Sequence, residues 1–335
     1  MTPTLLTIAL SLHALGLCAP PQTSSTPQAT PQATPQATPQ AAHTIPAESK
    51  AQSTTAFKPE VKYAQVGDVK LAYYIRGKGE PLLMINGFSS TMSLWDPSMI
   101  ETLAEQHQLI LFDNRGVGLS TDTEENHTTI PQMADDAAGL LRALGIKKAN
   151  VLAYSMGARI GQQLMIRHPE LLKKVVLCAA NPGGKYEDPA AKDVESVLND
   201  PNAPAMEKLA LTAPATDAGR AALKAAIERL KKAVAEGTIP NDLHVSKETI
   251  QRQDRARTTL WKADNSNFED LKKVKLPVLV TDGRDDAIDP PKNSLNIANQ
   301  IPFAWLAYFE GGHAFLYTSP QHFANTVNVF LQTSD

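Results

Sequence analysis

Short apolar runs recur along the chain from residue 82 onward, and each stops at a cluster of polar or small residues. Six of these runs are four or five residues long, which fits strands buried on both faces of a parallel sheet. Helix-compatible stretches follow several of them. We therefore predict an α/β fold. The runs are Leu82–Ile85, Leu109–Phe112, Asn150–Tyr154, Val175–Cys178, Val278–Thr281 and Trp305–Phe309.

The run that ends at Tyr154 is followed by a candidate nucleophile, Ser155, with the small residues Ala153 and Gly157 two positions to either side. This spacing is typical of a sharp strand-to-helix turn that strains the backbone of the serine and exposes its hydroxyl. The turn would also direct the N–H of Met156 toward a negative charge that develops near that hydroxyl. On this stretch alone, Ser155 could equally be the N-cap of an ordinary helix.

Two later runs add an acid and a histidine, so the chain order is serine, acid, histidine. The run Val278–Thr281 leads into a turn with four aspartates, and Trp305–Phe309 leads into two glycines and His313. Because open α/β sheets place their sites at the carboxyl ends of the strands, these residues can meet at one edge. All but one of the aspartates should be solvated turn or cap residues. The four are Asp282, Asp285, Asp286 and Asp289.

From about Lys62 to Leu331 these landmarks make the chain similar to the α/β-hydrolase superfamily. The resemblance implies a mostly parallel central sheet with helices on both faces. It also implies a helical cap that roofs the site, inserted after the sixth strand at about residues 184–270, where the alternation of strands and helices stops. Within it, 218–236 predicts an amphipathic helix that ends at Gly237, with an apolar stripe that packs against the main domain.

The resemblance also assigns roles to particular residues. It implies that Ser155 is the nucleophile, His313 the general base and acid, and Asp286 the residue that orients the histidine. The backbone N–H groups of Phe88 and Met156 would form the oxyanion hole. A site of this kind requires no cofactor.

Asp286 is preferred among the acids because the family spacing places the acid three residues after a glycine and four before a proline. Gly283 and Pro290 satisfy both conditions, and Asp285 is the alternative. The chain departs from the commonest family pattern at four positions, which leaves the narrower subfamily open. These positions are Asn86, Ser89, Ala153 and Ala158.

Several other polar residues are expected to be structural. Asp113 and Arg115 lie in a loop that is mostly structural in this family, and we interpret them as an internal hydrogen-bond clamp. Five further histidines lack the context of His313 and should be surface or packing residues. They are His107, His127, His168, His244 and His322.

Composition narrows the classes of partner. The formal net charge of −3 over 335 residues gives no electrostatic reason to expect nucleic acid, and no Cys/His cluster suggests a metal. We therefore expect a small-molecule substrate. Of the two cysteines, Cys18 lies in the leader, so Cys178 should have no disulfide partner in the folded part.

The first 57 residues differ from the rest. Leu5–Leu17 is a largely apolar stretch, too short to span a membrane, and small residues and prolines follow it. We therefore expect residues 1–18 to be a signal peptide or lipoprotein leader and the protein to be exported, whether periplasmic, secreted or lipid-anchored. The stretch Leu15–Cys18 resembles a lipoprotein box, in which a lipidated Cys18 would tether the protein to a membrane.

Residues 19–57 are rich in threonine, proline and glutamine and include tandem Thr-Pro-Gln-Ala repeats, so they should form a disordered linker before a domain at 58–335. For the chain as a whole, the resemblance implies a serine hydrolase that cleaves a carboxylic ester or lactone through an acyl-enzyme. Two alternatives stay open. One is amide hydrolysis, C–C bond hydrolysis or cofactor-free haloperoxidase chemistry on the same triad, and the other is a ligand-binding protein with slow turnover.

Overall fold

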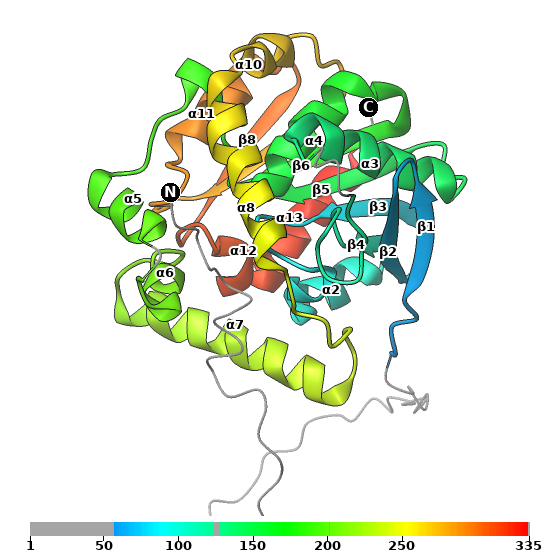
Figure 1. The fold of residues 1–335 in the computed structure, drawn as a ribbon, viewed down its shortest axis with the longest axis horizontal. Helices are drawn as coiled ribbons and strands as arrows, with labels where there is room; N and C mark the ends of the chain where they lie inside the picture. The colour runs from blue at the N-terminus through cyan, green and yellow to red at the C-terminus, as the bar shows by residue number, and fades with distance from the viewer. Residues whose placement is uncertain (1–56, 124–127, 201, 334–335) are drawn as a thin grey trace, which may run out of the picture.

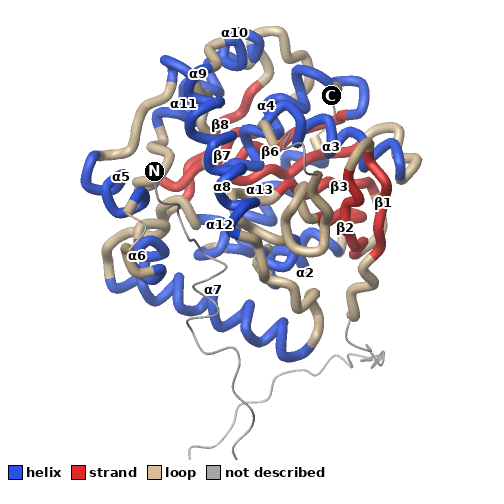
Figure 2. The backbone as a smooth tube through the Cα atoms, viewed as in Figure 1, coloured by secondary structure: helices blue, strands red, loops and turns tan. Residues whose placement is uncertain are grey.

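The computed structural model of the protein describes residues 57–123, 128–200 and 202–333. The expectations for the leader, for Cys18, for His127 and for the linker up to residue 56 lie outside the described residues. The described part is built on an eight-stranded sheet with helices packed on both of its faces (Figure 1, Figure 2). The predicted α/β-hydrolase fold is confirmed.

All six strands predicted from apolar runs are present, and two strands precede them. The order across the sheet is β1-β2-β4-β3-β5-β6-β7-β8. The pairs β1–β2 and β2–β4 are antiparallel, and the other pairs are parallel. The strands are β1 (Lys62–Val66), β2 (Val69–Arg76), β3 (Glu80–Ile85), β4 (His107–Phe112), β5 (Ala149–Tyr154), β6 (Leu172–Cys178), β7 (Val278–Gly283) and β8 (Ala304–Phe309).

An apolar core lies on each face of the sheet. One core joins the sheet to α3, α4 and α11, and the other joins it to α2, α12 and α13. The inner strands β3 to β7 therefore lie buried between two helical layers, which is why they appear in the sequence as continuous apolar runs. The edge strand β8 differs from the expectation, since only its last residue is buried. The helices of the two layers are α2 (Pro97–Ala104), α3 (Ile130–Ala143), α4 (Met156–Arg167), α11 (Lys292–Gln300), α12 (Phe315–Thr318) and α13 (Pro320–Gln332).

The segment between β6 and β7 is helical and contributes no strand to the sheet. Figure 1 shows α5, α6 and α7 along one side of the molecule and α8 crossing in front of the sheet. The helices of this segment are α5 (Lys192–Asn199), α6 (Ala205–Ala210), α7 (Asp217–Glu236), α8 (Lys247–Arg255), α9 (Trp261–Ala263) and α10 (Ser266–Leu271). A five-residue π-helical turn, Ala256–Leu260, joins α8 to α9.

Helix α7 begins one residue before its predicted start and ends before Gly237, as predicted. Gly237 has a φ of 61°, a left-handed conformation that favours glycine. Part of its apolar stripe packs within the cap, beside α6, through Leu223. The helix also contacts α2 and α12 of the main domain. Arg229 stabilises the contact between α7 and the main domain, since its guanidinium donates to the buried carboxylate of Asp96 at 2.7 Å.

Within the described residues, no helix combines the length and the apolar composition needed to cross a bilayer. Cys178 is a buried free thiol at the end of β6.

Candidate active site

The turn between β5 and α4 holds Ser155 in a strained conformation, with φ 56° and ψ −121°. The close approach of helix and strand explains the small residues around it. A Cβ added to Gly157 would lie 2.2 Å from the carbonyl oxygen of Ile85, and one added to Gly87 would lie 3.1 Å from the Cβ of Ser155. Any larger residue at position 157 would therefore push α4 away from the end of β3.

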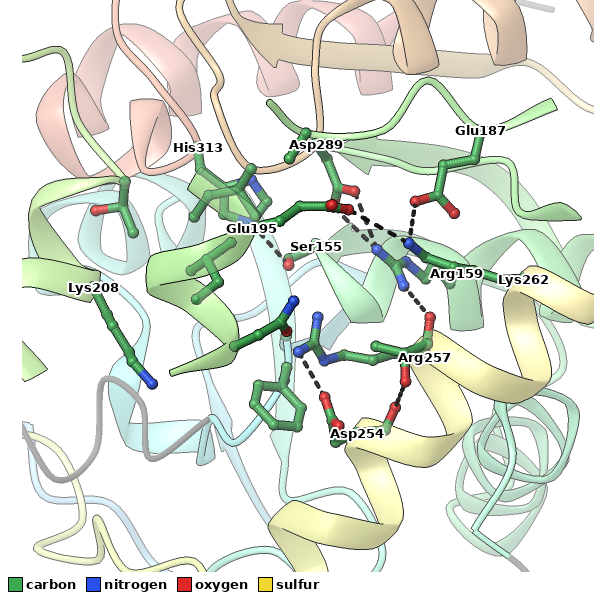
Figure 3. Close-up of a pocket in the computed structure, with 18 of the residues that line it drawn as sticks. Ser155, Arg159, Glu187, Glu195, Lys208, Asp254, Arg257, Lys262, Asp289 and His313 are labelled. Atoms are coloured by element: carbon green, nitrogen blue, oxygen red, sulfur yellow. Dashed lines mark hydrogen bonds and ion pairs between the residues drawn. The ribbon is translucent and has the colours of Figure 1, made fainter. Parts of the chain in front are cut away.

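His313 lies between this serine and an acid, in the loop after β8. Its Nε2 is 2.9 Å from the Oγ of Ser155 (Figure 3). Its Nδ1 is 2.7 Å from the Oδ2 of Asp286. His313 and Asp286 are both buried. The structure therefore brings together the three side chains that the resemblance singled out. This geometry allows the imidazole to accept the serine proton while the carboxylate holds the opposite ring nitrogen.

Asp286 is held in place by its own turn. Its Oδ1 accepts hydrogen bonds from the backbone N–H groups of Ile288 at 2.8 Å and Asp289 at 3.0 Å, which leaves Oδ2 for His313. The alternative acid, Asp285, is exposed, and no hydrogen bond joins its side chain to another described residue. Of these two neighbours, only Asp286 contacts the histidine.

The expectation that the remaining aspartates are solvated is wrong for two of them. Asp282 is buried because β7 extends to Gly283, and its carboxylate accepts a hydrogen bond from Ser294 at 2.6 Å. Asp289 is buried against Arg159, with N–O distances of 3.1 and 3.2 Å. Arg159 lies one helical turn after Ser155 in α4, so the pair forms part of the floor beside the nucleophile.

Burial and the neighbouring charges together set the pKa of His313. Burial lowers its pKa, but the neighbouring Asp286 carboxylate raises it by charge and hydrogen bond, Asp289 raises it further, and the net pKa lies above the usual 6.5. Burial raises the pKa of Asp289, but the charge of Arg159, together with His313, Arg257 and a hydrogen bond from Asn181, outweighs it, so the net pKa is lowered and the carboxylate stays ionised. Both carboxylates therefore stabilise the imidazolium form of His313.

The two implied oxyanion donors lie at the ends of β3 and β5. The N–H groups of Phe88 and Met156 donate to no other residue in the part of the chain that the structure describes, so both are free for a ligand. The Asn86 side chain shapes the loop that carries Phe88, since its Oδ1 accepts the N–H of Gly87 at 2.8 Å and its Nδ2 donates to the carbonyl of Thr91 at 3.0 Å.

The residue after Phe88 explains one departure from the family pattern. Ser89 has φ 52°, which proline cannot adopt, and its N–H donates to the Oε1 of Gln253 at 2.8 Å, which proline could not do. Gln253 is fully buried in α8, and Arg257, one turn further along, places its guanidinium 4.4 Å from the centre of the Phe88 ring. Two cap residues, Gln253 and Arg257, therefore contact the loop that carries the Phe88 N–H, one of the two implied oxyanion donors.

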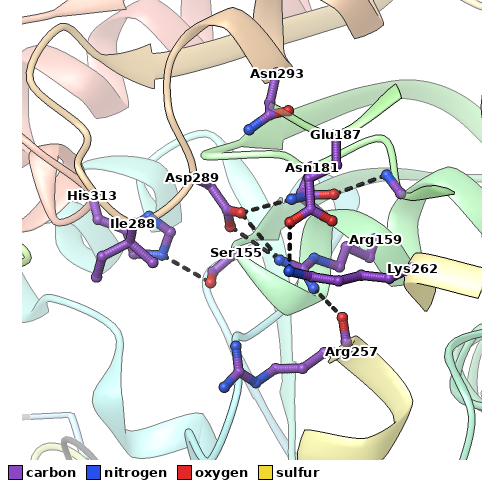
Figure 4. Close-up of polar contacts among 12 residues, drawn as sticks. Ser155, Arg159, Asn181, Glu187, Arg257, Lys262, Ile288, Asp289, Asn293 and His313 are labelled. Carbon is purple, nitrogen blue, oxygen red and sulfur yellow. Dashed lines mark hydrogen bonds and ion pairs between the residues drawn. The ribbon is translucent and has the colours of Figure 1, made fainter. Parts of the chain in front are cut away.

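A cavity of about 420 Å³ opens above Ser155 between the cap and the main domain. Its walls carry charged residues, most of them from the cap, and among these only Asp289 was named as a candidate from the sequence. Figure 4 shows Arg159 between Asp289 and the main-chain carbonyl of Arg257. Arg159 could have been found from the sequence, because it lies four residues after Ser155 and therefore on the same side of the predicted helix. The charged cap residues had no such spacing relative to a catalytic residue. The charged lining is Arg159, Glu187, Glu195, Lys208, Asp254, Arg257, Lys262 and Asp289.

The other residues expected to be structural do not line this cavity. Arg115 donates to both oxygens of Asp136 at 2.6 and 2.8 Å, and Asp113 accepts the backbone N–H groups of Met92 and Leu119, so the expected internal clamp forms. Among the described residues, no three His, Cys, Asp or Glu side chains gather as a metal site would require.

Comparison with known proteins agrees with this geometry. Residues 80–320 match the family described as the alpha/beta hydrolase fold. The chain is 30% identical over 263 residues to a putative non-heme bromoperoxidase of Mycobacterium tuberculosis, an alignment that covers 76% of this chain and 94% of that protein. It is 28% identical over 260 residues to a putative carbamate hydrolase of a Caulobacter species, covering 75% and 90% of the two chains.

Among solved structures, an alpha/beta hydrolase fold protein from Chitinophaga pinensis superposes with a TM-score of 0.72 at 28% identity. The superposition covers 83% of this chain and 99% of that one. Each of these three proteins is matched over at least 90% of its own length.

Proposed function

The chain belongs to the α/β hydrolase fold family and is a hydrolase, and from this premise we propose that it cleaves a carboxylic ester or lactone through an acyl-enzyme on Ser155. The observation that carries the proposal is the hydrogen-bonded series from the Oγ of Ser155 through His313 to Asp286, at 2.9 and 2.7 Å, on the wall of a cavity of about 420 Å³. A cavity of that size fits a small-molecule substrate.

In the first half of the proposed reaction, the Oγ of Ser155 attacks the substrate carbonyl as the Nε2 of His313 takes its proton. Such general-base catalysis is worth about 10²- to 10⁴-fold. Asp286 fixes the tautomer that leaves Nε2 free to accept the proton, and it stabilises the imidazolium that results. The imidazolium then gives the proton to the departing alcohol.

The negative charge on the carbonyl oxygen is stabilised by the N–H groups of Phe88 and Met156. Met156 is the first residue of α4, so the positive end of the helix dipole adds to its N–H. One such donor typically contributes about 3–4 kcal/mol. Water, deprotonated by the same histidine, then releases the acyl group and restores Ser155.

The experiment that tests this proposal is hydrolysis of a matched set of 4-nitrophenyl esters, anilides and carbamates, together with small lactones. We expect the esters or lactones to give the highest kcat/KM. If the carbamates give the highest kcat/KM, the result would instead favour carbamate hydrolysis, the activity that the name of the Caulobacter relative states. Binding of these compounds without turnover would replace the proposal with a ligand-binding protein.

The pKa of His313 leads to a prediction for pH dependence. Because the base must be neutral to accept a proton, kcat/KM is lost as pH falls below the pKa of His313, which lies above 6.5. We therefore expect kcat/KM to rise through one ionisation above pH 6.5 and then to level off. Ester hydrolysis measured from about pH 5 to 9 gives the profile, with circular dichroism at each pH as the control for folding. A flat profile would contradict the assignment of the base.

A further inference from the structure

One cation in the cavity has no hydrogen-bond or ion-pair partner among the described residues. Lys208 belongs to α6 and lines the same cavity as Ser155 and His313. The residue is only 2% exposed, yet its Nζ donates no hydrogen bond. An ammonium group that is removed from water without a compensating anion is unfavourable, so a buried unpaired lysine in a pocket is a candidate binding group.

The other basic residues of the cavity are already neutralised. Arg159 pairs with Asp289, and Arg257 pairs with Asp254 at 2.7 Å. Lys262 pairs with Glu187 at 3.1 Å. Within the described part of the chain, Lys208 is thus the cavity cation without an ion pair. Burial lowers the pKa of Lys208, and the charge of Asp200 raises it by less.

The fold brings Lys208 to the histidine side of the cavity. Thr212, four residues further along, accepts with its carbonyl the N–H of Ala314 at 2.8 Å, so the end of α6 lies against the loop that carries His313. Figure 3 shows Lys208 on the opposite side of the cavity from Arg159 and Lys262. A substrate acylating Ser155 could therefore extend toward Lys208 without disturbing the paired residues.

We propose that Lys208 binds a carboxylate carried by the substrate at a distance from the scissile bond, which makes the substrate a half-ester of a dicarboxylic acid or a lactone that bears a carboxylate. This inference rests on the proposed function, because it takes Ser155 as the point of acylation. A single ammonium matches a single negative charge.

The test compares 4-nitrophenyl half-esters of the linear dicarboxylic acids from succinic to suberic with neutral 4-nitrophenyl esters of the same chain length. For the wild-type protein we expect kcat/KM to favour the half-ester at one or two chain lengths. In Lys208→Met this preference should fall about 10- to 100-fold, the value of a charge-assisted hydrogen bond. Lys208→Arg, which keeps the charge, should retain part of it.

The matched control is Lys224→Met, which removes one exposed lysine from the same cap, in α7, and should leave the preference unchanged. Wild-type hydrolysis of neutral esters with no preference for any half-ester would overturn the inference and leave the proposed function standing. An equal preference in Lys208→Met would do the same.

A binding measurement separates the two proposals if no ester is hydrolysed. Titration calorimetry with the free dicarboxylates, which are the expected products, should show binding to the wild-type protein that weakens about 10- to 100-fold in Lys208→Met. That result would support the carboxylate site even if ester hydrolysis failed. Absence of binding together with absence of turnover would overturn the site as well.

Discussion

Replacement of Ser155 by alanine is expected to abolish ester hydrolysis, with a loss in kcat on the order of 10⁶-fold by analogy with other serine hydrolases. The Oγ is the atom that would form the acyl-enzyme, and the Nε2 of His313 lies 2.9 Å from it. No second hydroxyl in the described part of the chain is hydrogen-bonded to that Nε2. The measurement is turnover of a 4-nitrophenyl ester together with labelling by an organophosphonate.

Ser90 provides the matched control, because it lines the same cavity and its Oγ donates to the carbonyl of Phe88. Ser90→Ala should still be labelled, whereas Ser155→Ala should not. The melting temperature of Ser155→Ala should stay close to that of the wild type, since the substitution removes one oxygen atom. Undiminished labelling of Ser155→Ala would contradict the assignment of the nucleophile.

The second large effect is expected at Asp286. In Asp286→Asn the Oδ1 can still accept the N–H groups of Ile288 and Asp289, so the turn should be retained. The amide, however, can donate to the Nδ1 of His313 and favour the wrong tautomer. We therefore expect kcat to fall on the order of 10⁴-fold.

Asp285→Asn is the matched control, one residue away on an exposed side chain. It should change kcat by less than about tenfold, because Asp285 makes no contact with the histidine. The comparison uses the same ester at a pH on the plateau of the profile. A larger loss in Asp285→Asn than in Asp286→Asn would show that the acid was wrongly chosen.

Six of the eight strands could be predicted from the sequence as apolar runs. Five of them, β3 to β7, are covered by helices on both faces, and such strands must be apolar along most of their length. The sixth, β8, lies at the edge of the sheet with only one of its six residues buried, so burial on both faces does not account for its apolar run. β1 could not be predicted in this way. Only two of its five residues are buried, so its pattern alternates weakly and resembles that of a surface loop. The small residues around Ser155 were also informative, because Gly157 meets a steric requirement set within a few residues of the turn.

The choice among the four aspartates depended on the family spacing, since the residues themselves did not distinguish one carboxylate from another. That spacing led to Asp286, which the structure places against His313. The solvation of the other acids was decided by tertiary contacts. Asp289 is buried because Arg159, 130 positions away in the chain, comes to lie opposite it.

The sequence by itself therefore determined the class of fold, the strained turn and the three side chains that the family resemblance implies, because these depend on local periods and short spacings. Tertiary structure alone decided how the cap completes the site. Gln253 reaches the N–H of Ser89 across 164 positions, and Lys208 lines the cavity without an ion pair while Lys262 has one. The partner of a buried polar group depends on how distant segments pack, and no local pattern encodes that.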